Sequence, residues 1–179
     1  VNLLRQLGAE HDFEVEPLEL LPRVDGVDEP VSSTAIRRAL AGGDVTRANE
    51  MLGHTFEARG SVVTGDQRGR LLGFPTANVE VPNSTSLPAD GVYAGWYERP
   101  SGESHPCAIN LGRRPTFYEH ADSSLLEAHL LDFEADLYGE RARVRFTHFL
   151  RSERKFDGIE ALKDQLDLDT AHARGLLSE

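Results

Sequence analysis

The chain has 179 residues, 39% of them hydrophobic, which is enough for one sizeable core and a short appended piece. Its 19 basic and 30 acidic residues give a net charge of −11, which argues against a nucleic-acid partner. The sequence has no membrane-spanning apolar stretch and no basic-then-apolar start, so we expect a cytoplasmic protein without a membrane partner. The single cysteine, Cys107, excludes internal disulfides and multi-thiolate zinc sites and is expected to be a buried thiol.

Short helices are expected in the first fifty residues. Residues 1–30 combine a short amphipathic stretch with an apolar run that is closed by proline. Two compact helices should follow, over 35–41 and 45–52, because each stretch has a capping side chain before it and glycine after it. The expected caps are Ser33 or Thr34 for the first helix and Asp44 for the second.

From residue 56 the pattern becomes that of short strands separated by clusters of Gly, Pro, Asn and Asp. The expected strands are 56–63, 78–81, 91–98, 104–111, 124–131 and 141–150. Six strands in about 95 residues predict a six-stranded antiparallel Greek-key barrel, so the fold class is mainly β. Apolar residues at helical spacing predict a helix after residue 158, and Asp169 or Thr170 is expected to cap a last helix over 171–177.

The densest motif runs from residue 60 to residue 78 and reads GSVVTGDQRGRLLGFPTAN. Its glycines would let backbone N–H groups approach phosphate oxygens, although glycines alone could equally shape a long barrel loop. The Thr76 hydroxyl and the Asn78 carbonyl oxygen are hard neutral ligands suited to Mg²⁺. No Gly-Lys-Ser/Thr follows the glycines, so this is not a Walker A loop.

A second motif lies in the expected strand over 124–131. Strand alternation turns three apolar side chains to one face and Glu127 with His129 to the other. A carboxylate there could accept the proton of an attacking hydroxyl, or could simply be solvated. His129 lacks a partner at metal-ligand spacing and is expected to be structural. We assign no role to a row of cations on the last strand: Arg141, Arg143 and Arg145.

Residues 150–156 read LRSERKF and join the last strand to the C-terminal helix. An aromatic face and planar guanidinium groups can stack on a flat heteroaromatic ring or bond to its edge. The alternative is a strand-to-helix junction whose cations are solvated, and the residues alone leave both possibilities open.

Taken together, these motifs resemble the riboflavin kinase family. The resemblance rests on Pro-Thr-Ala-Asn at 75–78 after the glycines, Glu-x-His at 127–129, Asp-Leu-Tyr-Gly at 136–139 and the segment 150–156, and it covers the chain from about residue 53 onwards. It implies ATP-dependent phosphorylation of the ribityl 5′-hydroxyl of riboflavin, giving FMN and ADP with Mg²⁺ as cofactor.

The resemblance also implies roles for individual residues. Glu127 would be the catalytic base, and Thr76 and Asn78 would hold the metal. The residues that would bind ATP are Gly65, Gly69, Arg70, Gly73 and Thr76. The residues that would line the flavin pocket are Arg151, Arg154 and Phe156.

Upstream, residues 31–37 (VSSTAIR) resemble the closing motif of the FMN adenylyltransferase domain of bacterial bifunctional FAD synthetases. The chain lacks that domain's Gly-x-Phe-Asp-x-x-His-x-Gly-His segment, so we expect no FMN adenylylation from it. We therefore expect 1–52 to be a remnant of that domain with linker helices, and 53–179 to be the kinase barrel with its C-terminal helices. The full-length protein would carry the adenylyltransferase domain at its N-terminus.

Two rival functions remain on the same barrel. A non-catalytic flavin-binding module would not need Thr76, Asn78 and Glu127 together. An oligonucleotide-binding barrel is disfavoured by the net charge of −11 and by the lack of aromatic residues interleaved with basic ones.

Overall fold

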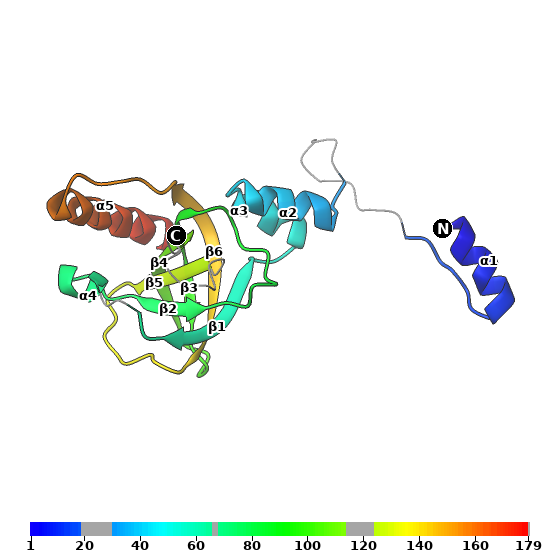
Figure 1. The fold of residues 1–179 in the computed structure, drawn as a ribbon, viewed down its shortest axis with the longest axis horizontal. Helices are drawn as coiled ribbons and strands as arrows, with labels where there is room; N and C mark the ends of the chain where they lie inside the picture. The colour runs from blue at the N-terminus through cyan, green and yellow to red at the C-terminus, as the bar shows by residue number, and fades with distance from the viewer. Residues whose placement is uncertain (19–29, 66–67, 114–123, 179) are drawn as a thin grey trace.

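The computed structural model describes residues 1–18, 30–65, 68–113 and 124–178, and its centre is a closed barrel (Figure 1). Neighbouring strands pair antiparallel in the order β1-β2-β5-β4-β3-β6. The six strands agree with the prediction within two residues at either end: β1 (Glu57–Val63), β2 (Ala77–Glu80), β3 (Gly91–Glu98), β4 (Ser104–Arg113), β5 (Ser124–Leu130) and β6 (Arg141–Arg151).

The strand order confirms the Greek key. Strands β3, β4 and β5 follow one another around the barrel, and β6 returns to lie beside β3. Strands β5 and β6 are therefore on opposite sides of the closed ring, so the connection between them has to cross the end of the barrel. We call this connection, residues 131–140, the crossover loop.

Alternation along the strands builds the barrel core. Leu126 and Ala128 of β5 are fully buried, while Glu127 between them and His129 beyond them are partly exposed, as predicted. Strand β6 alternates in the same way, with Ala142, Val144 and Phe146 buried. Cys107 also lies in this core, so the prediction of a buried thiol is confirmed, and burial raises the pKa of that thiol.

Two glycines allow the barrel to close tightly. A Cβ at Gly60 would lie 2.1 Å from the backbone oxygen of Glu80, and one at Gly95 would lie 1.9 Å from that of Arg145. Both are distances that a side chain cannot occupy. Strand β3 also shifts its register against β6 between Ala94 and Gly95, so the sheet bends at this point.

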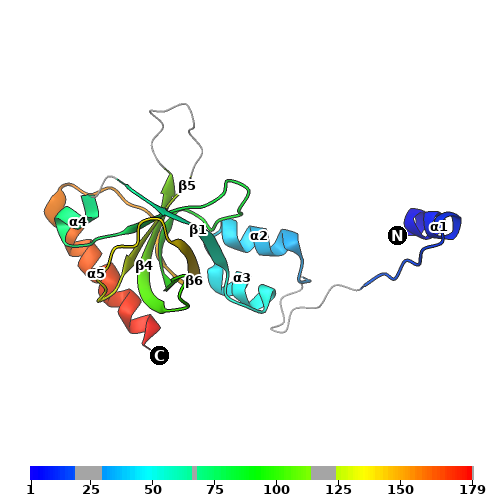
Figure 2. The same cartoon turned by 90° about the horizontal axis from the view of Figure 1, so that it is seen from below.

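The helical hairpin packs on one side of the barrel, next to β6 (Figures 1 and 2). It consists of α2 (Ser33–Ala41) and α3 (Val45–Leu52). Asp44 caps α3 by accepting from the Arg47 backbone N–H at 3.0 Å, as predicted. The cap of α2 is Ser32, because its hydroxyl accepts from the Ala35 N–H at 3.2 Å. The prediction of Ser33 or Thr34 was therefore wrong by one or two residues. Buried residues of the hairpin belong to the same apolar core as the barrel.

Three further helices complete the described chain: α1 (Asn2–His11), α4 (Arg68–Leu72) and α5 (Ile159–Leu177). Helix α1 lies apart from the barrel, whereas α4 and α5 lie side by side on the barrel flank away from the hairpin (Figures 1 and 2). The prediction of a separate last helix capped by Asp169 or Thr170 was wrong, because α5 runs through both residues without a break. None of the described helices is long and apolar enough to cross a membrane.

Candidate active site

Three polar side chains form a row across adjacent strands. Asn78 of β2 is the direct register partner of Glu127 on β5, and Glu127 is the partner of Asn110 on β4. Partners opposite each other on a sheet point to the same face, so the three side chains lie next to one another outside the core. The Asn110 amide donates to the Glu127 carboxylate at 3.2 Å. This bond fixes the orientation of the carboxylate.

Asn78 is unusual among these residues because it is 7% exposed and its side chain has no hydrogen bond to any other described residue. The Gly65 backbone lies against it: a Cβ at Gly65 would be 2.4 Å from the Asn78 amide nitrogen. Thr76 lies two residues earlier along the chain, directly before β2. The described residues contain no cluster of three or more His, Cys, Asp or Glu side chains that could hold a metal by themselves.

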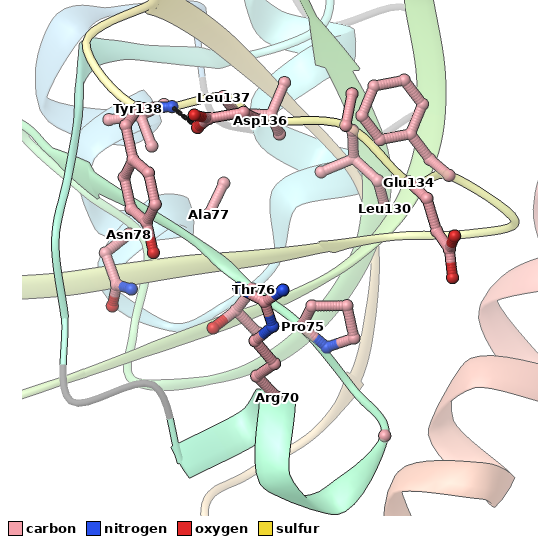
Figure 3. Close-up of a pocket in the computed structure, with 14 residues that line it drawn as sticks. Arg70, Pro75, Thr76, Ala77, Asn78, Leu130, Glu134, Asp136, Leu137 and Tyr138 are labelled. Carbon is pink, nitrogen blue, oxygen red and sulfur yellow. Dashed lines mark hydrogen bonds between the residues drawn. The ribbon is translucent and has the colours of Figure 1, made fainter.

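Two pockets of about 720 Å³ each open on this row, and both are lined by Thr76 and Asn78. The first pocket lies between the loop after α4 and the crossover loop, as Figure 3 shows. The second lies between α4 and α5 and includes Glu127 and Asn110 in its wall. Two molecules bound in these pockets would therefore meet at Thr76 and Asn78.

Among the described residues that line the first pocket, the one cation is Arg70 of α4, which Figure 3 labels together with Thr76. The crossover loop supplies the opposite wall: Phe133, Glu134, Ala135, Asp136, Leu137 and Tyr138. Tyr138 and Asn78 line the same pocket, and the Tyr138 backbone N–H donates to Asp136 at 3.0 Å. The sequence marked residues 136–139 as a family motif, but it did not predict that they form a pocket wall, because nothing in their spacing shows which strands they lie beside.

The predicted nucleotide residues are distributed over both pockets. Arg70, Gly73 and Thr76 line the first pocket, whereas Gly69 lines the second. Gly65 lines neither pocket and instead backs Asn78. Residues 66–67 of the predicted loop lie outside the described residues.

The second pocket contains all three residues of the predicted flavin set. The Arg154 guanidinium lies over the Phe156 ring at 4.9 Å, and that of Arg151 lies 5.8 Å from the same ring. Two leucines of α5, Leu162 and Leu166, complete an apolar side. A slot with one aromatic face, planar cations and an apolar helix suits a flat ring with a polar edge.

A buried ion pair holds Arg151 in this wall. Its guanidinium donates to the Asp169 carboxylate at 2.6 Å and 3.0 Å, and Asp169 is only 5% exposed. Gln165 donates to the same carboxylate at 2.6 Å and accepts from Arg154. Sequence reasoning missed Asp169 as a site residue because an Asp before an apolar run was taken as a cap. Its spacing of seven residues from Leu162, which puts both on one helix face, was the available signal.

His129 is held by backbone and aromatic contacts. Its Nδ1 lies 2.8 Å from the backbone oxygen of Pro75, and its ring meets the edge of Phe74 with centroids 5.4 Å apart. It also lines the second pocket, two residues after Glu127. A structural role for His129 remains a prediction.

The sequence is similar to those of known proteins. Residues 52–177 match the family model described as riboflavin kinase. A protein of Listeria monocytogenes is 37% identical over 96% of this chain and 53% of its own length, and one of Bacillus subtilis is 43% identical over 82% and 46%. Both are described as bifunctional riboflavin kinase/FMN adenylyltransferase. The chain spans about half the length of the curated relatives it matches.

The fold is also similar to that of a solved structure. A solved structure described as a macrolide-efflux protein of Streptococcus pneumoniae superimposes with a TM-score of 0.79 at 35% identity. The superposition covers 95% of this chain and 54% of the other. The arrangement of barrel and helices is therefore one that a solved structure also has.

Proposed function

Because the chain belongs to the riboflavin kinase family, we propose that it transfers the γ-phosphate of ATP to the ribityl 5′-hydroxyl of riboflavin, giving FMN and ADP. The observation that carries this proposal is the meeting of two pockets at Thr76 and Asn78, with Glu127 beside them. A phosphoryl transfer needs two substrates whose reacting ends are held in contact, and little other chemistry from the protein.

The first pocket is the proposed site of ATP. Backbone between Gly65 and Gly73 would approach the phosphates, with Arg70 as the nearby cation. The base and sugar would extend along the crossover loop, which forms the far wall.

The second pocket is the proposed site of riboflavin. The isoalloxazine ring would lie against Phe156 and α5, with the guanidinium groups of Arg151 and Arg154 at its polar edge. The ribityl chain would then extend towards Glu127, which lines the same pocket.

Mg²⁺ fits the shared row of the two pockets. The Asn78 carboxamide is enclosed yet makes no hydrogen bond to a described residue, and Thr76 lines the same two pockets. Neutral oxygen ligands in such small number suit a cation that keeps water and phosphate oxygens in its shell. When bound, Mg²⁺ would neutralise charge on the transferred phosphoryl group. Thr76 and Asn78 are the proposed protein ligands.

Glu127 is the proposed general base. It would accept the proton of the 5′-hydroxyl as that oxygen forms its bond to the γ-phosphorus, while the bond from the γ-phosphorus to the bridging oxygen breaks and ADP leaves. Asn110 would keep the carboxylate turned towards the hydroxyl through its 3.2 Å hydrogen bond.

The domain boundary is part of the proposal. We place the kinase unit at 53–179 and assign 1–52 to a remnant of an adenylyltransferase domain with its linker helices. The hairpin α2–α3 buries residues in the barrel core, so it would stay attached to the kinase unit as a packed support. In the full-length protein an adenylyltransferase domain would precede it.

The direct test is product formation. The purified chain is incubated with riboflavin, ATP and Mg²⁺, and the flavins are separated by chromatography. We expect FMN to appear with an equal amount of ADP, and lumiflavin, which lacks the ribityl chain, to yield no ADP. Bound riboflavin without any FMN would instead support a non-catalytic flavin-binding module.

A second incubation tests the expected lack of adenylylation. FMN replaces riboflavin and is incubated with ATP and Mg²⁺, and we expect no FAD. Appreciable FAD would contradict the assignment of 1–52.

A further inference from the structure

We propose that Arg99 is a positioning residue that holds the crossover loop in place as the wall of the first pocket, and thereby sets the affinity for the nucleotide. This inference rests on the proposed function, since it takes the first pocket to be the ATP site. Arg99 lies directly after β3, the strand between β4 and β6.

Arg99 binds the last residue of the crossover loop. Its guanidinium donates to both carboxylate oxygens of Glu140, at 2.5 Å and 3.2 Å, and a third nitrogen donates to Glu103 at 3.2 Å. The side chains of Arg99 and Glu140 are 24% and 20% exposed. A bidentate pair that is largely shielded from water holds its geometry better than an exposed pair.

Arg99 also contacts the other end of the loop. Its guanidinium lies over the Phe133 ring at 5.6 Å, and His105 packs against the same ring with centroids 4.3 Å apart. Phe133 is one of the residues that line the first pocket. One guanidinium therefore connects the beginning and the end of the segment that forms the pocket wall.

The loop between these contacts has few backbone anchors. Backbone hydrogen bonds join its two ends to the barrel. At the first end, the Leu131 N–H donates to the Pro106 oxygen at 2.9 Å. At the other end, the Gly139 N–H donates to the Val62 oxygen and the Val62 N–H donates to the Glu140 oxygen, both at 2.9 Å. Within it, Tyr138 donates to Asp136, and Glu140 donates to the Leu137 backbone oxygen at 3.1 Å. For residues 133–136, no backbone bond to the barrel is present among the described residues. Phe133 is the residue of this stretch that packs against the apolar core, while the Asp132–Arg174 ion pair and the packing of Leu137 hold the residues on either side.

The phenol of Tyr97, two residues before Arg99, is neutral. The Tyr97 phenol is fully buried, and burial, with the charge of Glu140 as the next cause, raises its pKa to about 12. It stays protonated at neutral pH and does not compete with Glu140 for the guanidinium. Arg99 is thus free to serve both the Glu140 carboxylate and the Phe133 ring.

Loss of the Arg99 guanidinium should lower the fraction of molecules in which the crossover loop is positioned to bind the nucleotide. The apparent affinity falls by the same factor as this population, so Arg99→Gln is expected to raise the KM for ATP by about tenfold. The KM for riboflavin should change less than about twofold, because the second pocket is lined by α4, α5 and the polar row rather than by the crossover loop.

The experiment measures both KM values and kcat for wild type, Arg99→Gln, Glu140→Gln and the double variant, with ADP binding followed by calorimetry. Glu140→Gln should raise the KM for ATP as Arg99→Gln does, and the double variant should be no worse than either single one. Arg99→Lys, which keeps the charge, should restore part of the affinity for ATP.

Arg143→Gln is the matched control. Arg143 is also an ion-paired arginine of the barrel, but its partners, Glu57 and Glu98, belong to strands β1 and β3 and not to the crossover loop. Both KM values of Arg143→Gln should equal those of wild type.

Two results would overturn the inference: an unchanged KM for ATP in Arg99→Gln, or an equal rise of both KM values, which would indicate general destabilisation. Wild type that neither binds ADP nor forms FMN would refute the proposed function itself. The two failures are therefore distinguishable.

Discussion

Asn78 occupies the point that both pockets and the polar row share, and it lies opposite Glu127 on the neighbouring strand. Its low exposure and its amide without a described hydrogen-bond partner are typical of a side chain kept for a ligand. The sequence predicted Asn78 and Thr76 from ligand chemistry together with the family motif. It did not predict that Asn110 holds Glu127, because partners across strands cannot be identified from a single sequence without the register.

Substitution of the two proposed metal ligands tests this residue-level assignment. We expect Asn78→Ala and Thr76→Ala each to lower the rate of FMN formation by at least about tenfold at low Mg²⁺, since each removes an oxygen ligand. Part of the rate should return at high Mg²⁺. Thermal melting should change little, because neither side chain belongs to the apolar core. Wild-type rates at low Mg²⁺ would show that these residues do not hold the cation.

Helix α5 shows how an element can be predicted while its function is missed. Its apolar spacing predicted a helix, but the ion pair between Asp169 and Arg151 joins residues 18 positions apart, beyond the reach of any local pattern. The same limit explains α4, a five-residue helix in a stretch where glycines predicted only a loop. By contrast, all six strands were predicted because alternation and turn residues are local signals.

Removal of the charge on Asp169 tests the role of α5. Asp169→Asn leaves the Arg151 guanidinium without its charged partner. We therefore expect the free energy of unfolding to fall by about 3 kcal/mol. Affinity for riboflavin should fall more than affinity for ATP, because Arg151 lines only the second pocket. Denaturant titration and flavin fluorescence measure the two effects.

Asp132→Asn is the control for that substitution. It breaks the exposed pair with Arg174, which joins α5 to the crossover loop, and should leave stability and the affinity for riboflavin unchanged. Equal losses in the two variants would remove any special role for Asp169.

At the scale of the whole molecule, one core includes the barrel and the hairpin α2–α3. Asn49 of α3 reinforces the junction by donating to the Phe146 backbone oxygen at 2.9 Å and accepting from the Phe56 N–H at 2.6 Å. The helical caps predicted the hairpin, but its attachment to the barrel arises from packing between distant segments. The proposed domain boundary at residue 53 therefore does not coincide with the edge of the packed core, which includes α2 and α3.

The core also predicts how stability depends on pH. Burial raises the pKa of Tyr93 and of Tyr97 from 10.0 to about 12, and it raises that of the Cys107 thiol as well. Above pH 10 the unfolded chain loses protons that the folded chain keeps, so stability falls as pH rises towards 12, by about 1.4 kcal/mol per pH unit for each such group. Below about pH 8 these groups should cause no pH dependence.

Urea midpoints between pH 8 and pH 11.5 measure this slope. Tyr97→Phe should reduce it, and should cost little stability at pH 8, because the buried Tyr97 hydroxyl has no partner among the described residues. A slope that is the same in wild type and Tyr97→Phe would contradict the assignment.

Phosphoryl transfer assisted by Glu127 at the meeting point of the two pockets is tested most directly by Glu127→Gln. Glutamine keeps the size of the side chain but cannot take the proton of the 5′-hydroxyl. We expect kcat to fall by about 10²–10⁴, the usual contribution of a general base, while ATP and riboflavin still bind with wild-type affinity. Glu80→Gln, on the exposed end of the neighbouring strand β2, should behave as wild type. A fall in kcat of less than about threefold would contradict the role of Glu127 and make His129 the next candidate.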